Sequence, residues 1–231
     1  MKLLFLILIL VSFKSFALEW ESGTDKSYLI ELYTSESCSS CPPAERWLNK
    51  IKESSSLYQS IVPVEYHVDY WNYLNWEDKH SDNKYTRRQR QFAQKRKTSV
   101  FTPQILQNGS LDLKYTASYP IESDEKAPNL KVKLNQNSGK VVLEVNRTDS
   151  LLCEAAVTQG GFKTKIKSGE NSGKTLKHEF VVKELQTTSL KNKKCEFSFS
   201  NLGSAGGKGI ALWLRSPESF KVIQATGRKL D

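Results

Sequence analysis

The 231-residue sequence lacks several features that common protein functions require. Met1 is its only methionine, so the soft thioether ligands that suit copper(I) are missing from the rest of the chain. Beyond the first 17 residues, no segment is long and apolar enough to cross a bilayer. No nucleic-acid-binding motif is found either. These absences argue against a membrane-spanning or nucleic-acid-binding protein and weaken the case for a copper-handling one.

The net charge of +9 is spread along the chain. The one dense basic cluster, residues 87–90 with residues 95–97, has helical spacing and is typical of a solvated helix face. We therefore expect a basic surface without a nucleic-acid partner.

The first 17 residues have the pattern of a secretory signal peptide. Lys2 precedes an apolar stretch from Leu3 to Phe13, and Ser15-Phe16-Ala17 places small residues before a cleavage site. An uncleaved anchor is the less favoured alternative, because a membrane span needs roughly 20 apolar residues. We expect a periplasmic or secreted protein that has no transmembrane segment after cleavage.

Two cysteines two residues apart carry most of the functional information. The apolar run from Tyr28 to Tyr33 predicts a buried strand, and apolar residues at i, i+3, i+4 and i+7 from Ala44 predict a helix. Cys38 and Cys41 lie between them, which is the arrangement of a dithiol redox site. The amino end of the helix favours the thiolate of Cys38 as the attacking sulfur. Cys41 would resolve the mixed disulfide. We expect Cys38 to be exposed.

The other two cysteines have a different pattern. Cys153 and Cys195 lie far apart in β-patterned segments, which predicts a structural disulfide in an exported protein. Structural zinc is disfavoured, because it usually takes two close cysteine pairs and only one is present. We expect no metal and no other cofactor.

The remaining pattern predicts two domains. Up to residue 124 the sequence predicts a strand over Ile61–Val68, a polar helix over Asn83–Lys97, a hairpin at Asn108-Gly109 and a short helix over Ala117–Ile121. From Leu130 onward, about eight short alternating runs predict a β-sandwich. The expected units are residues 25–124 and 129–231.

Thr102-Pro103 supports the redox interpretation. Thioredoxin-like domains place a cis-proline opposite the CxxC pair, where the loop docks the extended chain of a substrate. The segment FTPQILQNG resembles that element, and X-Pro bonds adopt cis far more readily than other peptides. An ordinary trans proline at an edge strand is the alternative.

A narrower resemblance covers most of the chain. The segments ELYTSESCSSCPP, VPVEYHVDYWNYLNWEDKHSD, YTRRQRQFA, FTPQILQNG and SGENSGKTLKHEFVVKEL are similar to successive blocks of a secreted bacterial family, domain of unknown function 1223. The resemblance implies an α/β thioredoxin-like N-terminal domain followed by an all-β sandwich-like C-terminal domain. Asn75 departs from the glycine expected at its position.

Several polar and aromatic residues are ambiguous. Glu31, within the first strand, could move protons for Cys41 or could lie at a solvated edge. His67, with Asp69 near it, could tune the thiolate or could be a hydrogen-bonded structural residue. Tyr70 and Trp71 could line a peptide groove or could seal the sheet edge. His80 and His178 are expected in solvent, and Arg88 and Gln89 have no assigned chemistry.

The leading hypothesis is an exported thiol–disulfide oxidoreductase that acts on protein or small thiol or disulfide substrates. Its redox partner and the direction of electron flow are not readable from the sequence. Two alternatives stay open: a copper(I)-binding or copper-delivery protein that uses Cys38, Cys41 and His67, and a non-catalytic adaptor.

Overall fold

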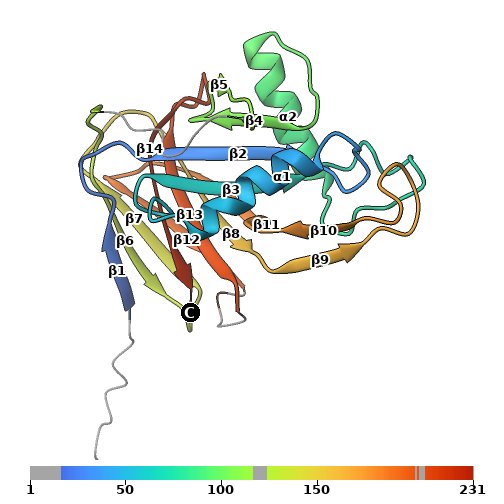
Figure 1. Ribbon diagram of the computed structural model, residues 1–231. Coiled ribbons are helices and arrows are strands. Elements are labelled where there is room, and N and C mark those ends of the chain that lie inside the picture. Colours follow the sequence, from blue (N-terminus) through green and yellow to red (C-terminus); the bar gives the residue numbers. More distant parts are fainter. Residues whose placement is uncertain (1–16, 117–123, 201, 203–205, 231) are drawn as a thin grey trace, which may run out of the picture.

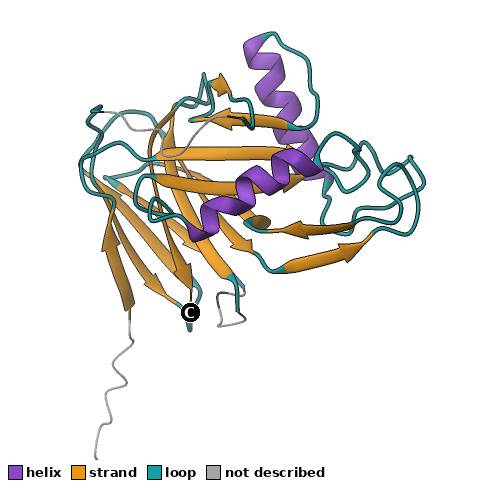
Figure 2. Cartoon of the chain, viewed as in Figure 1, coloured by secondary structure: helices purple, strands orange, loops and turns teal. Residues whose placement is uncertain are grey.

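We describe the protein from a computed structural model, which covers residues 17–116, 124–200, 202 and 206–230. Nearly all of the expected signal peptide, and the helix expected over Ala117–Ile121, lie outside these described residues. Within them the chain forms two α-helices, α1 (Pro42–Asn49) and α2 (Asn83–Arg96), a short 3₁₀-helix (Lys50–Glu53) and fourteen strands (Figures 1 and 2). No helix of this part is long and apolar enough to span a membrane.

One sheet of eight strands runs through the molecule in the order β14-β13-β8-β11-β3-β2-β4-β5 (Figure 1). Its strands are β2 (Tyr28–Thr34), β3 (Ile61–His67), β4 (Gln104–Gln107), β5 (Leu111–Asp112), β8 (Leu152–Gln159), β11 (Val181–Ser189), β13 (Lys208–Arg215) and β14 (Val222–Leu230). β2 pairs with β3 in parallel, and β11 pairs with the other edge of β3, also in parallel. The other neighbours are antiparallel.

The predicted fold class is therefore wrong. The protein is mostly β, and an α/β thioredoxin fold is not evident in the described part of the chain. The buried, apolar β3 needs a hydrogen-bonding partner at both of its edges. β11, a strand from the C-terminal half, supplies one of them. Sequence periodicity indicates that a segment is a strand but does not identify its neighbours.

A second sheet has the order β1-β6-β7-β12 and packs against the β-rich end of the first. Its strands are β1 (Ala17–Glu21), β6 (Leu130–Asn135), β7 (Lys140–Val145) and β12 (Lys194–Ser198). On β6, buried Leu130, Val132 and Leu134 alternate with exposed lysines, so one face of the strand forms core. The Cys153–Cys195 disulfide joins β8 in the large sheet to β12 in the small one.

Hydrogen bonding crosses the expected boundary between residues 124 and 129. β1 precedes that boundary and pairs with β6 beyond it, and β3 pairs with β11. The two domain ranges stay a prediction, but both contribute strands to the eight-stranded sheet.

The two helices lie on opposite faces of β2 and β3. Ala44 and Leu48 of α1 pack with Ile30 and Leu32 of β2, whereas Tyr85 and Phe92 of α2 pack with the alternate residues of β2 and β3. A hairpin of β9 (Phe162–Lys165) and β10 (Thr175–His178) projects past the loop that joins β3 to α2 (Figure 1). β2, α1, this loop and the hairpin together surround the CxxC segment.

Candidate functional site

Cys38 and Cys41 are joined in a disulfide in the loop between β2 and α1, with Cα atoms 5.4 Å apart. Cys38 is 5% exposed and Cys41 is fully buried. The expectation of an openly exposed Cys38 is therefore wrong. The two residues between the cysteines, Ser39 and Ser40, are exposed to solvent.

Hydroxyl groups, rather than the amino end of the helix, surround the first sulfur. Pro42 and Pro43 occupy the first two positions of α1 and have no N–H to offer. Oγ1 of Thr102 donates to Sγ of Cys38 at 3.2 Å, and Oγ of Ser40 lies 3.3 Å from the same sulfur. The donors nearest to Sγ of Cys38 are therefore side-chain hydroxyls, because the first two helix positions carry no N–H.

The loop that supplies Thr102 is held from two sides. The Thr102–Pro103 peptide bond is cis, the isomer that the sequence predicts. Nε1 of Trp71 donates to Oγ1 of Thr102 at 2.7 Å, which orients this hydroxyl. Nε2 of Gln89 donates to the Phe101 carbonyl at 2.8 Å, so Gln89 supports the loop. Tyr70 donates to Gln89 rather than reaching the sulfurs.

The structure does not bring Glu31 to the cysteines. Side chains alternate along β2, and Glu31 points to the α2 face, opposite the face that α1 covers. It is 2% exposed and forms an ion pair with Arg88 at 2.8 Å, so it does not lie at a solvated edge. Arg88 also binds Glu154, which pairs with Arg215. Burial raises the pKa of Glu31, although Arg88 opposes this shift.

The tip of the β9–β10 hairpin fixes the CxxC loop. Nδ2 of the fully buried Asn171 donates to the carbonyl oxygens of Glu36 and Cys38, both at 2.9 Å. The backbone N–H of Ser39 donates to Glu170 at 3.2 Å. A segment more than 130 residues further along the chain therefore positions the backbone of the first cysteine.

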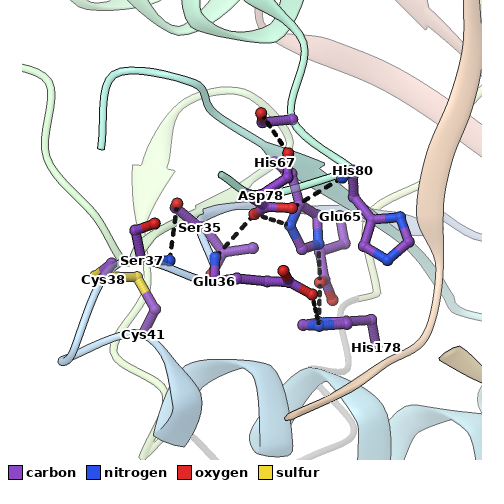
Figure 3. A network of polar contacts seen from close by, with 12 residues as sticks. Ser35, Glu36, Ser37, Cys38, Cys41, Glu65, His67, Asp78, His80 and His178 are labelled. Atoms are coloured by element: carbon purple, nitrogen blue, oxygen red, sulfur yellow. Dashed lines mark hydrogen bonds and ion pairs between the residues drawn. A yellow bond between two sulfur atoms is a disulfide. The ribbon is translucent and has the colours of Figure 1, made fainter. Parts of the chain in front are cut away.

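All three histidines of the sequence lie in a buried polar network next to this loop (Figure 3). Nδ1 of His67 lies 2.7 Å from Asp78, and Nε2 lies 2.7 Å from Glu65. His80 is 7% exposed and His178 is fully buried, so the expectation that both are solvated is wrong. Sequence reasoning missed this cluster, because its members lie on β3, the following loop and β10.

The charges in the network follow from burial and neighbours. Burial opposes protonation of His67, but Asp78 and Glu65 raise its pKa well above the usual value. Burial and the nearby His67 lower the pKa of His80 to about 4. Burial likewise opposes protonation of His178, but Glu36 and Glu65 raise its pKa to about 9.

These contacts give the copper alternative no support. Both ring nitrogens of His67 are taken by carboxylates, and the two sulfurs are bonded to each other. Asp69 has a separate structural role, since it accepts hydrogen bonds from Thr86 and Asn83 at the start of α2.

Asn75 adopts a backbone conformation that glycine favours. Its φ is +63°, in the left-handed region that glycine adopts freely and asparagine tolerates better than most residues. The loop is thus formed without the expected glycine.

Comparison with known proteins identifies the family. Residues 29–215 match the model of the family described as "Protein of unknown function (DUF1223)", so the chain belongs to that family. No curated protein matches the chain.

Two solved structures share the fold. A crystal structure of a protein from Agrobacterium tumefaciens is similar with a TM-score of 0.65 and 20% identity, covering 88% of this chain and 94% of that one. HBP35 of Porphyromonas gingivalis is similar with a TM-score of 0.62 and 17% identity, covering 90% of this chain and 76% of that one. At these identities the likeness concerns the fold alone. The two disulfides fit a protein that lies outside the reducing cytoplasm.

Proposed function

We propose that the protein is a periplasmic or secreted thiol–disulfide oxidoreductase that uses Cys38 and Cys41. The observation that carries the proposal is the contact between the Thr102 hydroxyl and Sγ of Cys38 at 3.2 Å. In the reduced protein the same hydroxyl can stabilise a thiolate at Cys38, because hydrogen bonds to the charged form favour it. Cys41, in contrast, is fully buried and suited to react only with its neighbour.

The proposed exchange has two steps. The Cys38 thiolate attacks one sulfur of a substrate disulfide, which breaks that bond and releases one substrate thiolate. The Cys41 thiolate then attacks Sγ of Cys38, forms the Cys38–Cys41 disulfide and releases the second substrate thiolate. The substrate gains two electrons and the cysteine pair loses them. Run in reverse, the same steps oxidise a substrate dithiol, and the proposal covers both directions.

The narrow exposure of Cys38 limits the substrate. A disulfide must reach the sulfur over Ser39 and Ser40, beside the partly exposed Thr102 and Trp71. A flexible peptide or a small thiol meets this requirement better than a disulfide held inside a folded protein.

The test is turnover with defined substrates. We expect the purified protein, supplied with dithiothreitol, to accelerate insulin reduction, and expect Cys38→Ser to abolish this activity. Cys41→Ser should instead accumulate a mixed disulfide, because the resolving thiol is lost. Ser39→Ala, a change at an exposed residue of the same loop, is the matched control.

Reactivation of scrambled ribonuclease measures the oxidising and isomerising directions with the same variants. If wild type and Cys38→Ser behave alike in both assays, the proposal is wrong and a non-catalytic adaptor becomes the better description.

A further inference from the structure

The three histidine rings meet at one buried point. The ring centroids of His67 and His178 are 4.9 Å apart, those of His67 and His80 are 5.3 Å apart, and those of His80 and His178 are 5.5 Å apart. Carboxylates of Glu36, Glu65 and Asp78 contact these rings or their backbone. Clusters of imidazoles and carboxylates that converge from separate elements are typical of metal sites.

The ring of His80 lacks hydrogen-bond partners in this cluster. Nδ1 and Nε2 of His80 are both buried and have no hydrogen-bond partner among the described residues. A buried polar atom without a partner destabilises the fold, so such atoms usually face a water or an ion. His80 is therefore the residue whose surroundings are least complete in the fold as described.

We propose that Glu36, His80 and His178 bind a divalent transition-metal ion, with zinc(II) as the reference ion. One ligand atom from each residue lies within 4.8 Å of the other two. Oε1 of Glu36 and Nε2 of His178 are 3.1 Å apart, close to the spacing of about 3.4 Å between ligands of a tetrahedral zinc ion. His80 is the third member of this set. Two imidazoles and one carboxylate leave a position open, as in catalytic zinc sites.

Neighbouring side chains form hydrogen bonds or close contacts that would orient the three proposed ligands. Nε1 of Trp76 donates to Oε2 of Glu36 at 2.9 Å, whereas Oε1 is the oxygen that faces Nε2 of His178. Nδ1 of His178 faces Oε1 of Glu65 at 3.4 Å, on the ring side away from Glu36. A carboxylate behind a ligating histidine fixes the ring and strengthens the ligand. The backbone N–H of His80 donates to Asp78 at 2.9 Å.

A second possible set, Glu65, His67 and His178, fits less well. Both nitrogens of His67 already have carboxylate partners at 2.7 Å, so binding an ion there would break a satisfied contact. His67 is better described as a positioning residue that holds Asp78 and Glu65 in place.

The proposed site borders the redox site without sharing a ligand with it. Asn171 donates to the carbonyl oxygens of both Glu36 and Cys38, so one side chain holds the loop that carries a residue of each site (Figure 3 shows the two sites side by side). No cysteine belongs to the proposed ligand set.

Metal analysis tests the proposal directly. The protein is purified without a histidine tag, stripped with a chelator, titrated with zinc(II) and measured by mass spectrometry. We expect one ion per chain. His80→Phe, which keeps an aromatic ring beside Phe162, should weaken binding by more than about 100-fold, because outer-shell changes alone weaken metal sites about 10- to 100-fold. Glu36→Gln should weaken binding similarly.

Two further measurements keep the outcome interpretable. Circular dichroism of each variant distinguishes lost ligation from lost folding. Cobalt(II) gives a visible spectrum that should lack a thiolate charge-transfer band. Cys38→Ser/Cys41→Ser is expected to retain the ion, which separates this proposal from the redox function. Folded wild type that retains no zinc(II), or His80→Phe that retains it fully, would overturn the proposal.

Discussion

The side-chain hydroxyl of Thr102 donates a hydrogen bond to Sγ of Cys38 across 64 residues of sequence. In the reduced form it would stabilise the Cys38 thiolate, so its loss should make the disulfide harder to reduce. A hydrogen bond to a charged group contributes about 1.5–3 kcal/mol. We therefore expect Thr102→Val to lower the reduction potential by about 30 mV or more, since 30 mV corresponds to about 1.4 kcal/mol.

Equilibration with glutathione buffers measures this potential. Thr98→Val, at an exposed threonine, is the matched control and should leave it unchanged. Equal potentials for Thr102→Val and wild type would show that the hydroxyl does not stabilise the thiolate.

Asn171 should control access to the disulfide. Replacing it with leucine leaves the buried carbonyl oxygens of Glu36 and Cys38 without their amide donor, at a cost of about 1–3 kcal/mol for each unsatisfied group. We expect a lower free energy of unfolding in urea and faster reduction of Cys38–Cys41 by dithiothreitol. Ser172→Ala changes the exposed neighbour and should do neither. An unaltered reduction rate for Asn171→Leu would mean that the hairpin does not hold the loop.

The buried ion cluster should make stability depend on acid pH. Burial opposes ionisation of Glu154, but Arg88 and Arg215 lower its pKa to about 2, against about 4.3 for an ordinary glutamate. Stability from Glu154 is therefore complete above about pH 4.3 and is lost as the pH falls through about 2, up to about 3 kcal/mol. Glu31, whose pKa is raised, contributes with the opposite sign and reduces the net change.

Urea unfolding between pH 2 and pH 7 measures this dependence. We expect Glu154→Gln to be less stable than wild type at pH 7, because Arg88 and Arg215 lose a buried partner. Its stability should also vary less between pH 4.3 and pH 2. If the unfolding free energy of Glu154→Gln falls as steeply with acid pH as that of wild type, other carboxylates cause the pH dependence.

The inter-sheet disulfide should support stability rather than chemistry. It closes a loop across a sequence separation of 42 residues, which stabilises by about 4 kcal/mol in the chain-entropy description. We expect Cys153→Ala/Cys195→Ala to melt at a lower temperature but to keep the proposed Cys38-dependent turnover below that temperature. Lost turnover in the folded double variant would link the two disulfides functionally.

Local patterns were reliable guides to the elements beside the cysteines. The apolar runs beginning at Tyr28 and Ile61 form β2 and β3, and the polar periodicity from Asn83 forms α2. These segments are specified by their own hydrophobic spacing and, for α2, by the Asp82 cap that accepts from Lys84. Short, distinctive motifs also predict a place beside the cysteines for Thr102, which contacts Cys38, and for Trp71, which contacts Thr102. Their role in substrate binding stays a prediction.

Long-range partners were not predictable in this way. Nothing in VVKELQTTS indicates that β11 pairs with β3, and nothing near His178 indicates that its ring meets His67 and His80. Closeness in sequence makes Glu31 a candidate for proton transfer to Cys41, whereas alternation along β2 turns it to the opposite face, where it is buried against Arg88.

The position of β3 between β2 and β11 has a practical consequence for anyone who divides this gene. A fragment ending near residue 124 would present the whole β11-facing side of β3 as an open edge, and the complementary fragment would leave β6 without β1. Such bare edges invite intermolecular pairing and insoluble material. We therefore expect isolated halves of the protein to aggregate when they are expressed, so that their activity could not be measured.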